Sequence, residues 1–116
     1  MIFCMKNLEN HNVFRIILEE LNNGKETYFS VHGNSMYPTI KDGENVKIIK
    51  YQNIKIGDII AYYLENNSEC KIIVHRVIFL RTKYVLTKGD NNKYIDPLRV
   101  PYENILGKVE LMDKSI

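Results

Sequence analysis

The segment 31–40, which reads VHGNSMYPTI, carries the residue types of a nucleophilic site. A β-rich run leads into Gly33 and Asn34, two residues that tolerate tight backbone geometry. Ser35 follows at once, and Pro38 then stiffens the exit from the turn. A nucleophilic serine needs such a rigid setting, because backbone N–H groups must lie close to the oxyanion that forms. Taken alone, the segment is more typical of a polar turn that caps a short helical stretch, because Gly-x-Ser turns are common.

The segment 71–79, which reads KIIVHRVIF, is predicted to be a strand that carries a second candidate residue, His75. On a period of two, Ile73, His75 and Val77 share one face of this strand. Branched apolar neighbours desolvate an imidazole ring and favour its neutral form, which a general base requires at neutral pH. The alternative is a core histidine that a single hydrogen bond satisfies.

The segment 86–97, which reads LTKGDNNKYIDP, supplies the carboxylates Asp90 and Asp96 in a turn-rich loop after a predicted strand. A base histidine works better when a carboxylate holds its tautomer and stabilises the imidazolium. The same residues suit a turn in which Asp90 and the asparagines beside it bond their own backbone. Both interpretations hold together if one aspartate shapes the loop and the other faces His75.

The helix that precedes these segments is predicted from hydrophobic spacing. Within residues 10–23, four apolar residues fall on one helical face: Phe14, Ile17, Leu18 and Leu21. Gly24 is well placed to end the helix. We expect this apolar face to pack on the core of the domain.

The strands that must position the candidate residues follow as short β-rich runs separated by turn residues. They are predicted at 27–32, 44–50, 58–64, 71–80, 84–87 and 105–111. The expected fold is therefore mainly β: an antiparallel β domain with one N-terminal α-helix. We expect a single domain, made of an N-terminal helical segment over residues 1–26 and the β domain over residues 27–116.

Composition narrows the class of function. The chain has 116 residues and a formal net charge of +2, with 16 basic and 14 acidic residues. This balance, without a block of like charges, argues against a nucleic-acid partner. The 2 cysteines have no metal-ligand spacing, and we expect neither a metal nor another cofactor. No stretch reaches the roughly eighteen apolar residues of a membrane span, so we expect a soluble protein, cytoplasmic or peripherally associated with a membrane.

Taken together and in this order, the motifs resemble the signal peptidase I superfamily, which also includes the self-cleaving LexA-like repressors. The stretch GNSMYPT at 33–39 resembles the Ser-Met-x-Pro-Thr nucleophile box of that superfamily. The other similar stretches are DGENV at 42–46, with its acidic residue shifted, GDIIAY at 57–62, IVHRVI at 73–78 and TKGDNN at 87–92. Several ordered boxes over roughly residues 28–111 are far more specific than any one of them.

The resemblance implies a serine peptidase whose nucleophile is Ser35. Most bacterial signal peptidases and LexA-like proteins carry a lysine base where this chain has His75, whereas the endoplasmic-reticulum type carries histidine. The closest resemblance is therefore to that Ser–His–Asp type. Its orienting acid lies six residues beyond the boxed aspartate, which implies Asp96 as the orienting residue and Asp90 as a supporting or loop-forming residue.

The implied activity is cleavage of signal or leader peptides from precursor proteins by acyl transfer. The resemblance further suggests small side chains next to the scissile bond and an extended peptide substrate. Some family members add a hydroxyl to the oxyanion hole two residues before the nucleophile, where this chain has Gly33. Signal peptidases of this type are normally anchored in a membrane, so a membrane-protein partner is one explanation for a chain without an apolar span.

Two other functions compete with this interpretation. A LexA-like self-cleaving regulator would carry an Ala-Gly or Cys-Gly cleavage site, and neither dipeptide occurs in the sequence. The residues before the first predicted strand are also too few for a helix-turn-helix domain. A non-catalytic peptide-binding module would be expected to lose one residue of the Ser, His and Asp set. His32, close to Ser35, is expected to line the substrate groove or the surface.

Overall fold

The computed structural model describes residues 2–6, 8–66 and 69–112 of the chain. Within this part the elements follow one another as β1 (Ile2–Lys6), α1 (Leu8–Asn22), β2 (Thr27–Ser30), β3 (Asn45–Ile49), β4 (Ile59–Asn66), β5 (Glu69–Leu80), β6 (Tyr84–Lys88), β7 (Val100–Pro101), a 3₁₀ turn (Tyr102–Asn104) and β8 (Ile105–Leu111). Every strand pair is antiparallel. The predicted mainly β fold with an N-terminal helix is thereby confirmed.

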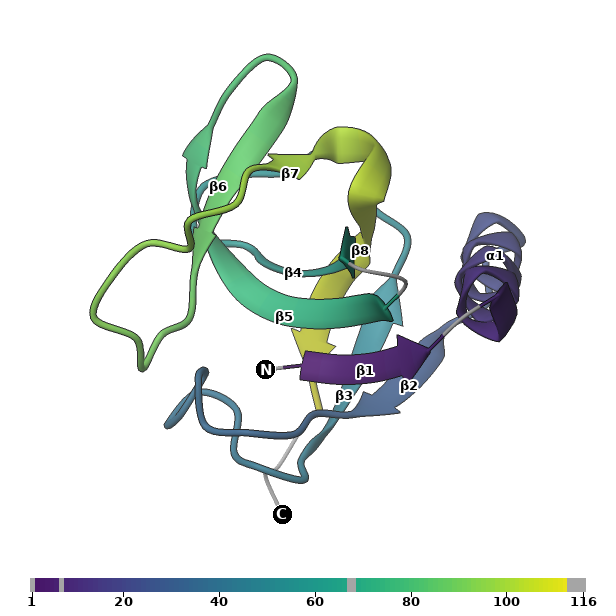
Figure 1. Ribbon diagram of the computed structural model, residues 1–116, viewed down its shortest axis with the longest axis horizontal. Coiled ribbons are helices and arrows are strands. Elements are labelled where there is room, and N and C mark those ends of the chain that lie inside the picture. Colours follow the sequence, from purple (N-terminus) through teal and green to yellow (C-terminus); the bar gives the residue numbers. More distant parts are fainter. Residues whose placement is uncertain (1, 7, 67–68, 113–116) are drawn as a thin grey trace.

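All strands belong to one sheet with the order β2-β3-β8-β4-β5-β6-β7, and β1 pairs with β5 beside this path. Figure 1 shows that the sheet is strongly curved, with β5 crossing its centre. The pairing of β4 with β5 is the longest, running from Ile59 opposite Arg76 to Asn66 opposite Glu69. This hairpin is the framework on which the site is built.

The two faces of β4 are both buried, because hydrophobic clusters cover the sheet on each side. Ile59 and Ala61 belong to one cluster, which also contains Ile17 and Leu21 of α1. Ile60 and Tyr62 belong to a second cluster with residues of β5, β6 and β8. Because neighbouring residues of a strand point to opposite faces, one apolar run supplies both clusters.

The helix α1 packs at one side of the sheet through the predicted apolar face (Figure 1). Ile17 and Leu21 are only 5% and 1% exposed, and Leu18 packs against the same cluster. The side chain of Phe14 lies outside the described part of the chain. Gly24 has a φ of +79°, a left-handed conformation that favours glycine, and it lies just beyond the end of the helix.

β1 is an element that the sequence did not predict. Residues 2–6 pair antiparallel with the first half of β5, with Ile2 opposite Ile73 and Lys6 opposite Glu69. Five residues without a clear two-residue alternation carry too weak a signal for a strand. The N-terminal segment 1–26 therefore contains a strand as well as a helix, and the strand belongs to the sheet of the β domain.

The loop after β2 and the loop after β6 meet beside β5 (Figure 1). Their contact is direct, since the backbone N–H of Asn91 donates to the Ser35 carbonyl oxygen over 2.8 Å.

No helix in the described part of the chain is long and apolar enough to cross a membrane.

Candidate active site

The loop after β2 holds Ser35 in a fixed turn. Gly33 has a φ of +97°, which favours glycine, and its N–H donates to Asp42 Oδ1 over 2.8 Å. The N–H of Tyr37 donates to the Asn34 carbonyl oxygen over 3.1 Å. Met36, directly after Ser35, is fully buried. A buried anchor and local hydrogen bonds on both sides leave the Ser35 backbone little freedom.

This loop crosses the edge of β5 at the point where His75 lies. On that edge, the described pairing with β1 reaches Ile73 and the pairing with β6 begins at Arg76. Met36 belongs to the same buried cluster as Val74, whereas Ser35 contacts the next residue, His75. Val74 and His75 point to opposite faces of β5. The loop therefore contacts both faces of β5, at the stretch of its edge that lies between β1 and β6.

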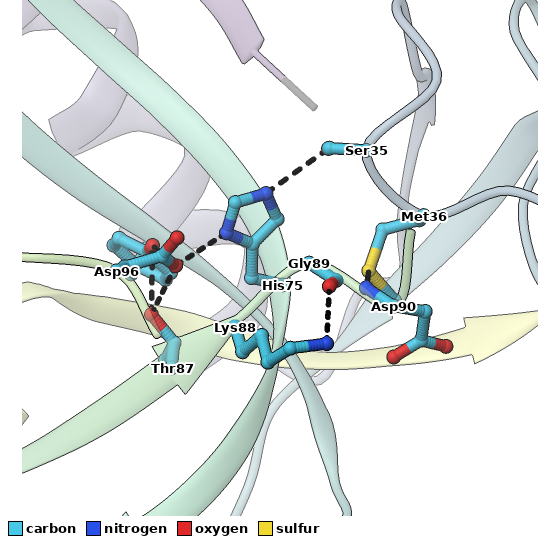
Figure 2. Close-up of polar contacts among 9 residues, drawn as sticks. Ser35, Met36, His75, Thr87, Lys88, Gly89, Asp90 and Asp96 are labelled. Atoms are coloured by element: carbon cyan, nitrogen blue, oxygen red, sulfur yellow. Dashed lines mark hydrogen bonds and ion pairs between the residues drawn. The ribbon is translucent and has the colours of Figure 1, made fainter. Parts of the chain in front are cut away.

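Ser35, His75 and Asp96 form one chain of hydrogen bonds (Figure 2). His75 Nε2 lies 3.0 Å from Ser35 Oγ, and His75 Nδ1 lies 2.5 Å from Asp96 Oδ2. His75 itself is 7% exposed. Each ring nitrogen of one buried histidine therefore contacts a different partner, with the hydroxyl on one side and the carboxylate on the other.

Asp96 is held by two further side chains. Thr87 Oγ1 donates to Asp96 Oδ2 over 2.8 Å, and the Tyr62 hydroxyl lies 3.4 Å from the same oxygen and 3.0 Å from Thr87 Oγ1. Burial alone would raise the pKa of Asp96, but the hydrogen bonds from His75 and Thr87 outweigh it and lower that pKa. The carboxylate is therefore ionised at neutral pH and aimed at the histidine.

Asp90 has other partners, although it lies in the same loop. Arg76 donates two hydrogen bonds to Asp90, from Nε to Oδ1 over 2.8 Å and from Nη2 to Oδ2 over 2.7 Å. Thr39 Oγ1 donates to Asp90 Oδ2 over 2.6 Å. Hydrogen bonding to Arg76 lowers the pKa of Asp90, burial opposes this effect and Thr39 reinforces it. Asp90 thus ties the loop after β6 to β5 and to the loop of the serine.

The turn that contains Asp90 also packs closely against the backbone of Ser35. A Cβ added to Gly89 would lie 2.7 Å from the Ser35 carbonyl oxygen, so no larger residue fits there without a shift. The Asn91 side-chain amide donates to the Asn34 carbonyl oxygen over 3.0 Å, and the Asp90 N–H donates to the sulfur of Met36 over 3.3 Å. These contacts fix the distance between the serine loop and the turn.

A cleft of about 470 Å³ opens at Ser35 and His75. Its walls come from the serine loop, the β4–β5 hairpin and the loop after β6, and Asp96 also lines it. His32 lies on its rim, with a side chain that is 59% exposed and 4.0 Å from Asp42 Oδ1. His32 was expected in the substrate groove or on the surface, and its side chain lies at the cleft and is exposed. The nucleophile candidate is thus open to a ligand from one side.

The profile of the peptidase S24-like family matches residues 4–110. The chain belongs to the peptidase S24-like family. The resemblance to the signal peptidase and LexA superfamily is thereby confirmed at the level of the family, which suggests a serine peptidase or a self-cleaving LexA-like protein. No protein among the curated sequences matches the chain.

The structure of this S24-like protein brings Ser35, His75 and Asp96 together and separates Asp90 from them. Sequence reasoning missed Thr87 and Tyr62, which the same network contains. Thr87 is the first residue of the TKGDNN box, but a threonine in a strand is ordinary, and only its complete burial next to Asp96 distinguishes it. Among the described residues, no group of three potential ligands could hold a metal ion.

Proposed function

We propose that this S24-like protein is a serine endopeptidase that removes signal or leader peptides from precursor proteins. The observation that carries the proposal is the chain of hydrogen bonds from Ser35 through His75 to Asp96, at a cleft open to solvent. A nucleophile, a base and an acid that orients the base are the parts that covalent acyl transfer requires. The resemblance of the five sequence boxes supplies the class of substrate.

In the proposed mechanism, His75 Nε2 removes the proton from Ser35 Oγ as the oxygen attacks the scissile carbonyl carbon. Asp96 accepts the Nδ1–H of His75, which fixes the tautomer in which Nε2 accepts from Ser35 Oγ, and it stabilises the imidazolium. His75 then donates this proton to the leaving amine, and the acyl-enzyme forms. Water, deprotonated by His75, hydrolyses the acyl-enzyme and restores Ser35.

The oxyanion of the tetrahedral intermediate needs backbone donors close to the nucleophile. The N–H of Gly33 donates to Asp42, so this group belongs to the structure of the loop. We assign the backbone N–H of Ser35 to the oxyanion, because it lies on the residue whose side chain attacks. The loop keeps its place through the hydrogen bond from the Asn91 N–H to the Ser35 carbonyl oxygen.

A histidine base supports the endoplasmic-reticulum type of signal peptidase over the lysine-dyad types. His75 is followed by Arg76, whose guanidinium is occupied by Asp90 and by the Gly57 carbonyl oxygen. Lys88, at the end of β6, donates its Nζ to the Gly89 carbonyl oxygen over 3.3 Å, whereas Ser35 Oγ contacts the imidazole of His75. This pairing supports a Ser–His–Asp system.

Self-cleavage is the competing activity within the family. Neither Ala-Gly nor Cys-Gly occurs in the sequence, so the chain has no dipeptide of the kind that LexA-like proteins cut in themselves. Incubation of the purified protein provides the test. We expect its mass to remain constant, and cleavage of its own chain at a site lost in Ser35→Ala would favour self-cleavage instead.

A fluorophosphonate probe and a leader-bearing precursor peptide test the proposed activity. Wild type should be labelled at Ser35 and should cut the precursor at one site, whereas Ser35→Ala and His75→Ala should do neither. Ser30→Ala is a matched control and should retain labelling, because Ser30 lies on β2, which leads into the serine loop, and its Oγ donates to Asn45 Oδ1 rather than to a residue of the site. Cleavage that persists in Ser35→Ala, or a wild type that neither reacts nor cleaves, would remove the proposal.

A further inference from the structure

The strand that carries His75 has partners from its own chain on both sides of the histidine. Along the edge of β5 that faces away from β4, the antiparallel pairing with β1 ends at Ile2 opposite Ile73, and β6 pairs from Arg76 onward. Figure 1 shows β1 lying alongside β5. Ile73 also lines the cleft at Ser35, so β1 and the cleft meet at one residue of β5.

An extended peptide that is cut at Ser35 needs this same edge. Ser35 Oγ lies 3.0 Å from His75 Nε2, so the scissile carbonyl of such a peptide must lie beside the histidine. The backbone N–H and C=O groups of an extended peptide need partners, and the edge of a strand supplies them. Because an extended chain advances about 3.3 Å per residue, the next few residues of the peptide would reach Ile73 and the stretch of β5 that β1 occupies.

β1 and β6 differ in how firmly they belong to the fold. β6 forms a hairpin with β5, pairs with β7 on its other edge, and carries Val85 and Thr87, which are fully buried. Among the described strands, β1 pairs with β5 only. Loss of β6 would open a hydrophobic cluster and remove the support of Asp96, whereas loss of β1 breaks one strand pairing. β1 is therefore the partner that a peptide can displace.

Exchange of β1 for a peptide strand costs little free energy. The peptide restores to the edge of β5 the backbone hydrogen bonds that β1 gives up, so the net change from these groups is small. The helix α1 begins at Leu8, and its Ile17 and Leu21 are buried in the core. A detached β1 therefore stays tethered close to β5 and competes at a high effective concentration.

We infer that β1 is an autoinhibitory strand, which occupies the edge of β5 on which a precursor peptide pairs and must detach before the peptide reaches Ser35. The inference rests on the proposed peptidase activity and adds a control of access to its site. Only molecules with β1 detached bind the peptide, so the apparent affinity falls in proportion to their fraction. Changes at β1 should therefore alter KM and leave kcat nearly unchanged.

A disulfide between β1 and β5 tests the inference, because it prevents β1 from detaching. Met5 is the cross-strand partner of Cys70. Such partners have Cα atoms about 4.5 or 5.5 Å apart, within the range of about 4.4–6.8 Å that a disulfide spans. Met5→Cys can therefore bond to Cys70, with Cys4→Ser in the same chain to prevent mispairing. Oxidation should raise KM for the precursor peptide about tenfold or more, and reduction should restore it.

The fluorophosphonate probe and a matched variant distinguish a locked strand from a damaged site. The probe needs no strand pairing, so the oxidised and reduced forms should be labelled at Ser35 at the same rate. Addition of Cys70→Ser removes the bond and should abolish the response to oxidation. An unchanged KM after oxidation, or an equal loss of labelling, would overturn the inference. A wild type that neither reacts nor cleaves would remove the proposed activity instead.

A proline in β1 tests the opposite change. Cys4→Pro, at the middle of the strand, should weaken its pairing with β5, because proline cannot donate a backbone hydrogen bond and fits poorly within a strand. We expect KM for the precursor peptide to fall about threefold to tenfold, with kcat nearly constant. A higher KM or a lower kcat would mean that β1 supports the site rather than blocks it.

Peptide binding to Ser35→Ala gives a readout that does not depend on cleavage. Amide hydrogen exchange in residues 2–6 should become faster when the precursor peptide binds, while the amides of β4 stay protected. Faster exchange supports the inference even if wild type proves inactive. Exchange in residues 2–6 that is unchanged or slower, or a peptide that does not bind, overturns it even if wild type is an active peptidase.

Discussion

Asp90 and Asp96 are two aspartates of one loop, and they have different partners. Asp96 faces His75 on the cleft side of β5, with Thr87 and Tyr62 behind it. Asp90, in the turn that follows β6, faces Arg76, the next residue along β5. The neighbouring residues His75 and Arg76 point to opposite faces of the strand. Two aspartates on one loop therefore contact a histidine on one face of the strand and an arginine, a permanent cation, on the other.

The role of each of these carboxylates depends on the group that it contacts. The pKa values of both carboxyls are lowered, Asp90 chiefly by Arg76 and Asp96 by His75 and Thr87 against the opposing effect of burial. Asp90 binds an arginine, which cannot serve as a base because its charge is permanent. Only Asp96 contacts a group that can take and return a proton. Substitutions that change one aspartate at a time should therefore have separable effects.

The largest difference should appear in Asp96→Asn. An amide in place of the carboxylate cannot stabilise the imidazolium and favours the wrong tautomer of His75, so we expect kcat to fall by about 10⁴-fold. The folded structure should persist, since an amide oxygen can still accept from Thr87. Steady-state cleavage of the precursor peptide measures the effect, with Asp90→Asn as the control. A similar loss in Asp90→Asn would erase the proposed division of roles.

A second large effect should follow from Gly89→Ala, in the turn of Asp90. The new Cβ would lie 2.7 Å from the Ser35 carbonyl oxygen and would displace the serine loop. Because small misplacements of reacting groups are costly, we expect kcat to fall by about 10²-fold. Gly43→Ala is a suitable control, since Gly43 has a positive φ but open space around it, and it should lower stability more than activity. Full activity of Gly89→Ala would mean that this turn does not position Ser35.

A smaller effect is expected for Thr87→Val, which changes a residue that supports Asp96 and not Asp90. Valine has nearly the same shape but removes the donor to Asp96 Oδ2 and a partner of the Tyr62 hydroxyl. We expect kcat to fall about tenfold, with KM unchanged, because one hydrogen bond to a charged group is lost. Thr87→Ser should restore most of the activity. Equal losses in both variants would point to packing rather than to the hydroxyl.

The smallest effect concerns the stability that Asp90 contributes as the pH changes. Its pKa in the folded protein lies below the usual value of 3.8, so the contribution is present above pH 3.8 and is lost as the pH falls through the folded value. Asp90→Asn should be about 1–2 kcal/mol less stable than wild type at pH 7, because the ion pair is only partly buried. Denaturant unfolding at pH 7 and below pH 3.8 should show this difference shrinking in acid. A difference that stays constant with pH would contradict the ion pair.

Much of the fold was predictable, because its strands have apolar residues at the expected spacing. The run from Ile59 to Leu64 and the alternation in Glu44–Lys50 mark β4 and β3 in the sequence alone, and β8 has the predicted bounds. β7 escaped prediction because it is only two residues long, and β1 because its residues do not alternate. Neither strand has a local signal, and both exist because β5 and β6 offer them an edge to pair with.

For the candidate site, the chemical groups could be predicted from the sequence: a serine in a tight turn, a histidine on a β-strand and two aspartates in a loop. The family resemblance then favoured Asp96 over Asp90. The distances, the partners of each aspartate, the support from Thr87 and Tyr62, and the apolar lining of the cleft depend on the folded chain. The physical reason is that hydrogen bonds act over about 3 Å. Contacts at that range between residues dozens of positions apart depend on strand register and loop placement, which no local pattern encodes.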